Sequence, residues 1–146
     1  MNTIINISTK KIALIVNGKS QRGRKLFKRS LELFKLHEIQ LNQTYCVRKP
    51  KDIKKIIQES IASGINMIII GGGDGTISEA VDLGVKSKVL FAILPLGTSN
   101  SFARSLNMPL DLEDAILTIK AGNVTQIDLG RIGDDYFANT DRKSVV

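Results

Sequence analysis

Short runs of apolar residues constrain the fold of this chain more than any other feature. The runs lie at residues 12–16, at 66–70 and in "KVLFAILPLG" (88–97). Each is too short for a typical helix, and none alternates polar with apolar residues, so each predicts a strand that is buried on both faces. A sheet built from such strands needs helices on both sides, because one layer of helices would leave the other face in water.

Helical patterns separate these strands, as the fold requires. We expect helices at 24–36, from Pro50 to a cap at Gly64, at 76–83, briefly within 98–107, and from Asp111 to Gly122. A more exposed strand is expected in "EIQLNQTYCV" (38–47), and a final hairpin in "TQIDLGRI" and "YFAN", around residues 133–135. This order predicts one α/β domain over residues 1–146, a three-layer α/β/α sandwich with a mainly parallel sheet.

Three loops leave predicted strands at the edge where ligands bind in such sheets, beyond the carboxyl ends of the strands. We call them the first loop (17–23), the glycine loop (71–75) and the second loop (95–100). All three are rich in Gly, Ser, Thr or Asn. The sequence therefore predicts a ligand site at this edge.

The glycine loop, in "IIIGGGDGTISEA", fails two familiar phosphate motifs. Gly71 and Gly73 suit a dinucleotide fingerprint, but Thr76 stands where its last glycine belongs, and Ala13 stands where a P-loop would begin. Glycines still let backbone N–H groups approach phosphate oxygens. Asp74 would repel a phosphate unless a cation lay between them, which favours Mg²⁺ with a nucleotide. Without a ligand, a capping box from Thr76 to Glu79 and a turn at Asp74 would also explain these residues.

Charge and composition narrow the partners. Lys and Arg number 21 against 14 Asp and Glu, so the formal net charge of +7 favours a nucleotide, an acidic lipid headgroup or nucleic acid. No aromatic residues are interleaved with the cations, so nucleic acid is not expected. Cys46 is the one cysteine, which fits a reducing cytosol. No apolar run nears the roughly 20 residues of a membrane helix, so membrane contact is expected to be peripheral.

The chain resembles a known family in "GGGDGTISEA", followed by "FAILPLGTSNSFARSLNMPLDLEDAI" and "IDLGRI". This is the diacylglycerol kinase catalytic-domain family, which includes bacterial lipid kinases and the sphingosine and ceramide kinases. The resemblance covers about residues 11–139. NAD kinases share the Gly-Gly-Asp-Gly-Thr element and are the runner-up, but the stretch at 94–104 is much more specific to the lipid kinases.

The resemblance implies an ATP-binding domain of a kinase that transfers the γ-phosphate of ATP to a lipid hydroxyl, such as that of diacylglycerol, with the help of Mg²⁺. The implied ATP-binding residues are Asn17, Gly72, Gly73, Asp74, Gly75, Thr76, Glu79 and Thr98. Asp74 and Asp128 are the implied metal residues, acting through water. No catalytic residue is expected in this chain, because the family's base comes from a later region.

Departures from the family pattern qualify these expectations. Gly18 replaces the usual proline of the first loop, Ser101 stands where many members have Asp, and Val47 where relatives often have a threonine that contacts the nucleotide. The chain also stops where the family continues into a β-rich lipid-binding domain. We therefore expect the nucleotide-binding domain alone, inactive in transfer, with a non-catalytic nucleotide-binding fragment as the alternative. Self-association could cover the apolar face that the missing domain would cover, and the location would be cytoplasmic, peripheral to the membrane.

Several other residues have ordinary explanations. We expect His37 at the surface and Cys46 as a small buried apolar residue. Arg104 could bind phosphate or pair with Asp111 or Glu113. Arg22, Arg24 and Lys25 could steer an anionic nucleotide or contact a membrane, but a solvated helix start is favoured slightly.

Overall fold

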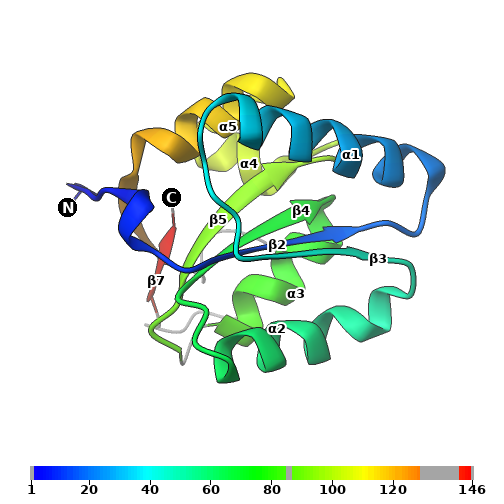
Figure 1. The fold of residues 1–146 in the computed structure, drawn as a ribbon, viewed down its shortest axis with the longest axis horizontal. Coiled ribbons are helices and arrows are strands. Elements are labelled where there is room, and N and C mark those ends of the chain that lie inside the picture. The colour runs from blue at the N-terminus through cyan, green and yellow to red at the C-terminus, as the bar shows by residue number, and fades with distance from the viewer. Residues whose placement is uncertain (1, 85–86, 129–141, 146) are drawn as a thin grey trace.

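The computed structural model describes residues 2–84, 87–128 and 142–145 and shows three layers (Figure 1). A seven-stranded sheet lies in the middle, in the order β1-β6-β7-β5-β4-β2-β3. Helices α1, α4 and α5 cover one face of the sheet, and α2 and α3 cover the other. Strands β3, β2, β4 and β5 are parallel to one another. The predicted α/β sandwich with a mainly parallel sheet is confirmed.

The elements follow the order expected from the sequence. The strands are β1 (Asn2–Ile4), β2 (Ile12–Asn17), β3 (Gln43–Val47), β4 (Met67–Gly72), β5 (Leu90–Pro95), β6 (Asn123–Asp128) and β7 (Arg142–Val145). The α-helices are α1 (Gln21–Leu36), α2 (Ile53–Ala62), α3 (Asp74–Gly84), α4 (Ser101–Ser105) and α5 (Leu112–Ala121), with short 3-10 turns at Ile7–Thr9 and Pro50–Asp52.

The register of the parallel strands positions the loops. Ile15 lies opposite Ile70, and Gly72 lies opposite Pro95, so β2, β4 and β5 end at one edge of the sheet. Side chains in the central parts of these three strands are at most 1% exposed. Both faces of the sheet are therefore dry at its centre, as the unbroken apolar runs predict.

Some boundaries differ from the predictions. Strand β4 continues through Gly72, and α3 begins at Asp74 rather than Thr76, so the glycine loop is shorter than expected. Strand β3 begins at Gln43, since residues 38–42 form the turn after α1. Strand β1 was not predicted, because three residues carry too little pattern to identify. It pairs antiparallel with β6 at the sheet edge.

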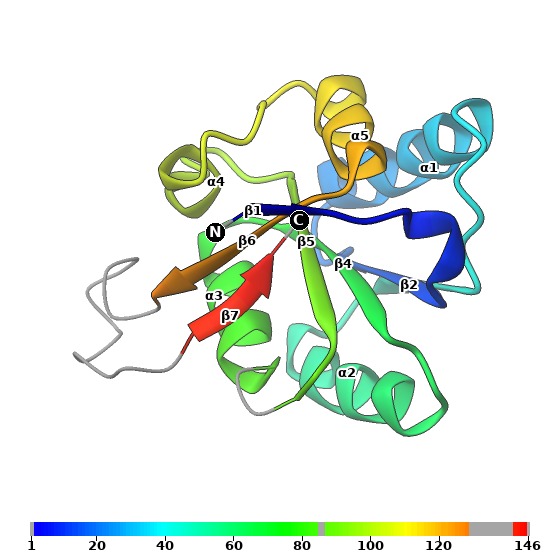
Figure 2. The same cartoon turned by 90° about the vertical axis from the view of Figure 1, so that its left-hand side faces the viewer.

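Strand β7 lies between β5 and β6 and pairs antiparallel with β6 (Figure 2). The first half of the predicted hairpin thus forms a strand. The predicted strand "YFAN" and its turn at 133–135 lie outside the described residues.

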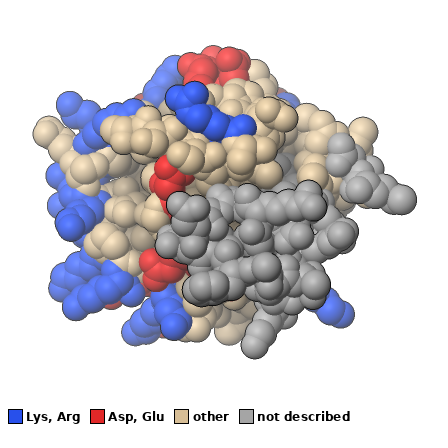
Figure 3. Space-filling model, turned by 180° about the vertical axis from the view of Figure 1, so that it is seen from behind, with Lys and Arg blue, Asp and Glu red and all other residues tan. Residues whose placement is uncertain are grey.

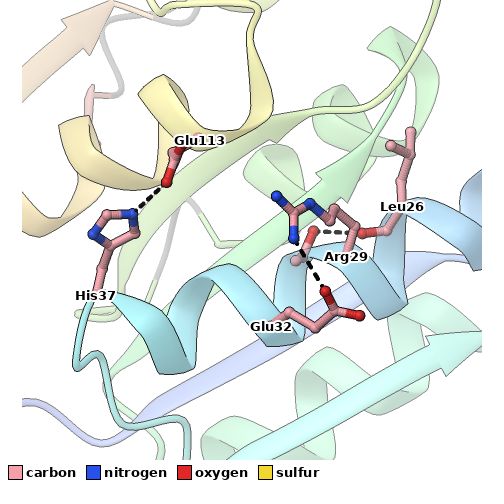
Figure 4. A network of polar contacts seen from close by, with 6 residues as sticks. Leu26, Arg29, Glu32, His37 and Glu113 are labelled. Carbon is pink, nitrogen blue, oxygen red and sulfur yellow. Dashed lines mark hydrogen bonds and ion pairs between the residues drawn. The ribbon is translucent and has the colours of Figure 1, made fainter.

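Helix ends show why the chain folds locally as it does. The side chain of Asp111 accepts a hydrogen bond from the backbone N–H of Asp114, and Gly122 ends α5 in a left-handed conformation with φ 73°. His37 follows α1, and its Nε2 lies 2.7 Å from Oε2 of Glu113 on α5 (Figure 4). His37 is only partly exposed, and its contact with Glu113 joins α1 to α5. This contact lies at the end of α1 that is farthest from the first loop.

Within the part of the chain that the structure describes, no helix has the length and apolar character needed to cross a bilayer.

The buried sheet predicts a steep dependence of stability on its central residues. Ile69 is fully buried on β4, so Ile69→Ala should lower the free energy of unfolding by about 2–5 kcal/mol. Leu36→Ala is the control, because Leu36 is 67% exposed, and its effect should stay within about 0.5 kcal/mol. Urea unfolding followed by circular dichroism measures both; equal losses would contradict this account of the core.

Candidate functional site

The three loops meet in an open cleft at the carboxyl edge of the sheet. The cleft has a volume of about 690 Å³. It is lined by Asn17, Lys19, Ser20, Arg22 and Gly23 of the first loop and the start of α1, by Gly72, Gly73 and Asp74, and by Leu96, Gly97, Thr98 and Ser99 of the second loop. These loops, far apart in sequence, thus line one cleft.

A side-chain hydrogen bond ties the first loop to α3. Nδ2 of Asn17 donates to Oγ1 of Thr76 over 3.0 Å, while Oδ1 of Asn17 accepts from the backbone N–H of Lys19. Asn17 and Thr76 therefore hold each other. The alternative capping box is wrong in its geometry, because α3 begins two residues before Thr76 and the backbone carbonyl of Gly73 accepts from Ile77.

Asp74 ties the glycine loop to the second loop. Its Oδ1 accepts from the backbone N–H of Phe102, in the first turn of α4, over 2.9 Å. Asn100, at the N-cap position of α4, makes no side-chain cap of its own, so Asp74 satisfies a helix N–H from another element. The second oxygen, Oδ2, has no hydrogen-bond partner among the described residues. One half of the carboxylate is structural, and the other half is available.

Arg22 makes a third tie, between α1 and the second loop. Its Nη1 donates to the backbone carbonyl of Leu96 over 2.8 Å. The three side-chain hydrogen bonds thus join the first loop to α3, the glycine loop to the start of α4, and the start of α1 to the second loop. Arg22 is exposed at the start of α1, as the favoured expectation of a solvated helix start has it, and it makes this hydrogen bond in addition. Nothing in the sequence alone indicates which carbonyl an arginine reaches 74 residues away.

The glycines of the site divide into two groups. A Cβ on Gly72 would come within 2.9 Å of the Thr76 side chain, and a Cβ on Gly97 within 2.6 Å of the Gly73 backbone. These two positions need glycine because segments pack tightly there. A Cβ on Gly73 would make only an ordinary contact, and one on Gly75 would meet nothing within 4 Å. Packing therefore does not require glycine at 73 or 75, which leaves those backbones open to a ligand.

The residues expected to bind nucleotide occupy different places. Asn17, Gly72, Gly73, Asp74 and Thr98 line the cleft. Gly75, Thr76 and Glu79 lie on α3 beside it, and Gly75 and Glu79 are exposed. Asp128 is the last residue of β6, but its side chain lies outside what the structure describes.

Metal ligands are sparse in this part of the chain. Among the described residues, no three His, Cys, Asp or Glu side chains gather closely enough to hold a metal ion. Mg²⁺ usually keeps several waters and takes one or two carboxylates together with substrate phosphates. The free oxygen of Asp74 fits that weaker requirement, although it could not hold a structural ion alone.

The structure also shows where the residues that depart from the family pattern lie. Val47 is buried, and its backbone carbonyl accepts from the N–H of Gly18 over 2.8 Å, a bond that a proline at position 18 could not donate. Ser101 is exposed at the start of α4. Arg104 pairs with neither Asp111 nor Glu113, since its Nε donates to the carbonyl of Ser99.

Positive charge surrounds the cleft. Figure 3 shows Lys and Arg side chains gathered along the edge where the parallel strands end. At this edge the exposed cations Lys19, Arg22 and Lys25 follow β2, and Arg48, Lys49 and Lys51 follow β3. The field of these side chains attracts an anionic ligand to the cleft.

Comparison with known proteins agrees with this geometry. The model of the family described as diacylglycerol kinase catalytic domain matches residues 11–132. The chain belongs to this family. The chain is 34% identical over 136 residues to a diacylglycerol kinase of Staphylococcus saprophyticus, covering 89% of this chain and 44% of the relative. It is 37% identical over 134 residues to the Serratia proteamaculans protein named "Probable lipid kinase YegS-like", covering 86% of this chain and 42% of that one.

Solved structures of relatives support the same assignment. The crystal structure of a diacylglycerol kinase from Bacillus anthracis matches this chain with a TM-score of 0.69 and 29% sequence identity. The match covers 81% of this chain and 42% of that chain. The chain therefore spans less than half the length of these relatives.

The two groups of glycines predict opposite effects on stability. Gly97→Ala should lower the melting temperature by several degrees, because its Cβ would overlap the Gly73 backbone and separate the loops. Gly75→Ala should leave the melting temperature unchanged or raise it, since α3 favours Ala over Gly and space is free. Differential scanning calorimetry of both variants gives the comparison. A destabilised Gly75→Ala protein would show that packing also requires glycine at that position.

Proposed function

We propose that this chain is the ATP-binding domain of a lipid kinase, in which the γ-phosphate of ATP passes to a lipid hydroxyl such as that of diacylglycerol. The observation that carries the proposal is the cleft itself, where three loops of a diacylglycerol kinase catalytic domain are tied together around open glycine backbone. Phosphoryl transfer depends mainly on positioning and on neutralising charge. A rigid, cationic cleft suits both tasks.

The phosphates of the nucleotide would lie over Gly73 and Gly75. A Cβ on Gly75 would meet nothing within 4 Å and one on Gly73 would make only an ordinary contact, and α3 places the positive end of an 11-residue helix at the same point. Lys19 and Arg22 bring side-chain charge to the cleft wall. The proposed ATP contacts are Asn17, Gly72, Gly73, Asp74, Gly75, Thr76, Glu79 and Thr98, of which Asn17 and Thr76 also fix the shape of the cleft by their mutual bond.

Asp74 is the proposed link to Mg²⁺, directly or through water, by its free oxygen Oδ2. When bound, Mg²⁺ would neutralise phosphate charge and so remove the repulsion between ATP and the carboxylate. Asp128 is proposed as a second, water-mediated partner. The bond from Phe102 to Oδ1 holds the Asp74 carboxylate in place, so the free oxygen keeps a fixed direction.

The lipid side of the reaction is proposed by membership of the family. Diacylglycerol or a similar lipid is the proposed acceptor, met at the surface of a membrane. The cations along the carboxyl edge of the sheet suit such a surface as well as the nucleotide. We propose that the acceptor-binding groups belong to the part of the relatives that this chain does not match.

A second candidate function is nucleotide binding without turnover. Among the described residues that line the cleft, Asp74 is the one carboxylate, and no His, Cys, Glu or Tyr accompanies it. A side chain that could accept the proton of a lipid hydroxyl is thus lacking there, apart from the group proposed to hold the metal. This favours a chain that binds ATP and needs other residues to transfer phosphate.

Substitution can separate the structural role of the Asp74 carboxylate from its proposed role in binding the metal. Asp74→Asn keeps an oxygen that accepts from Phe102 but removes the charge, so MgATP should bind at least about tenfold more weakly while the fold stays stable. Asp74→Ala should lose MgATP binding and about 1 kcal/mol of unfolding free energy as well, because the α4 N–H loses its partner. Titration calorimetry and urea unfolding measure the two effects. Wild-type affinity in Asp74→Asn would refute the metal role.

Gly75→Ala tests the phosphate position without disturbing the fold. Its methyl group would stand where a phosphate is proposed to approach, so MgATP affinity should fall about tenfold or more while the melting temperature holds. Ser105→Ala is a suitable control, because Ser105 is exposed on α4 outside the cleft lining. Unchanged MgATP binding by Gly75→Ala would show that no phosphate lies at this position.

Transfer activity distinguishes the two candidate functions. With radiolabelled ATP and diacylglycerol in mixed micelles, we expect this 146-residue chain to bind ATP but to label little or no lipid. Robust labelling would show that the chain holds every group the reaction needs and would overturn the second candidate.

A further inference from the structure

The bond from Arg22 to the second loop is the one tie that neither the motifs nor the proposed ligand contacts account for. Arg22 is the second residue of α1, and its guanidinium reaches across the cleft wall to Leu96. The other two ties use Asn17 and Asp74, which are already among the proposed ATP contacts. Arg22 is not among them.

Leu96 anchors the start of the second loop. Its backbone N–H donates to the carbonyl of Gly72 over 3.0 Å, and its side chain is 6% exposed and packs where Gly71 leaves room. The bond from Arg22 fixes the carbonyl on the other side of the same residue. The main chain of Leu96 is thus held by β4 and by α1 at once.

The residues that follow Leu96 line the cleft, so the position of Leu96 affects theirs. Asn100 is buried in a left-handed conformation with φ 51°, and its amide group bonds both the N–H and the carbonyl of Gly97. Residues 97–100 therefore form a closed turn that moves as a unit. Fixing Leu96 fixes the part of that turn that lines the cleft, including Thr98.

Interactions within α1 do not favour an arginine at position 22. A cation in the first turn of a helix opposes the positive end of the helix dipole, and the first turn of α1 holds no acidic residue. The guanidinium has five N–H donors, and one bond to Leu96 leaves others for a ligand. Its charge is also placed at the wall of a cleft that Lys19 lines.

We propose that Arg22 is a positioning residue of the nucleotide cleft, which holds the second loop at Leu96 while its charge faces the phosphates. The proposal rests on the proposed binding of ATP. It assigns to α1 a part in shaping the site that would otherwise belong to loops alone.

The test compares Arg22→Gln, Arg22→Lys and Lys28→Gln in the 146-residue chain. Lys28→Gln is the matched control, since Lys28 is an exposed cation farther along the same helix and outside the cleft lining. Titration calorimetry should show MgATP binding about tenfold weaker in Arg22→Gln, within about threefold of wild type in Arg22→Lys, and nearly unchanged in Lys28→Gln. Lysine should rescue because it restores both a donor and the charge.

Hydrogen exchange without nucleotide tests the positioning itself. Amides of residues 96–100 should exchange several-fold faster in Arg22→Gln, while those of the central strands keep the wild-type rate. Unchanged exchange in this segment, or MgATP affinity equal to wild type, would overturn the role of Arg22 alone. Failure of the wild-type chain to bind MgATP would overturn the proposed function, and this role with it.

Discussion

The parallel pairing of β2, β4 and β5 is the constraint on which the rest of the structure depends. Parallel strands must all end at the same edge, and their burial on both faces forces helices to cover the sheet. The chain returns across helices between these strands, and β4 lies between β2 and β5. Three loops from distant parts of the sequence meet as a consequence of backbone pairing, before any side chain of the site makes a bond.

Side-chain hydrogen bonds then hold the loops in their positions around the cleft. Asn17, Asp74 and Arg22 each bond to a different segment beside the cleft, with donor–acceptor distances of 2.8–3.0 Å. Together the three bonds tie the loops and the starts of α1, α3 and α4 to one another. Asp74 illustrates the economy of the arrangement: one oxygen holds the site together, and the other faces the proposed metal.

The sequence predicted the layers, the mainly parallel sheet and the three loops at its carboxyl edge, because these follow from apolar runs, helix caps and the geometry of parallel sheets. Asp111 and Gly122, for example, marked the ends of α5 by local chemistry alone. The partners of Asp74 and Arg22 could not be predicted in the same way. Each bonds to a backbone group tens of residues away, and any residue type supplies such a group. Likewise, the reason for glycine at 97 appears only when Gly73 lies against it.

The bond between the Gly18 N–H and the Val47 carbonyl bears on how members of this family diverge. It ties the first loop to the edge strand β3 through main-chain atoms, and the space beside Gly18 is taken by the sulfur of Cys46. A lineage with proline at this position must hold its first loop by other means and must leave room beside it. Positions 18 and 46 should therefore change together during evolution, and this pair could sort related sequences into groups with differently anchored first loops.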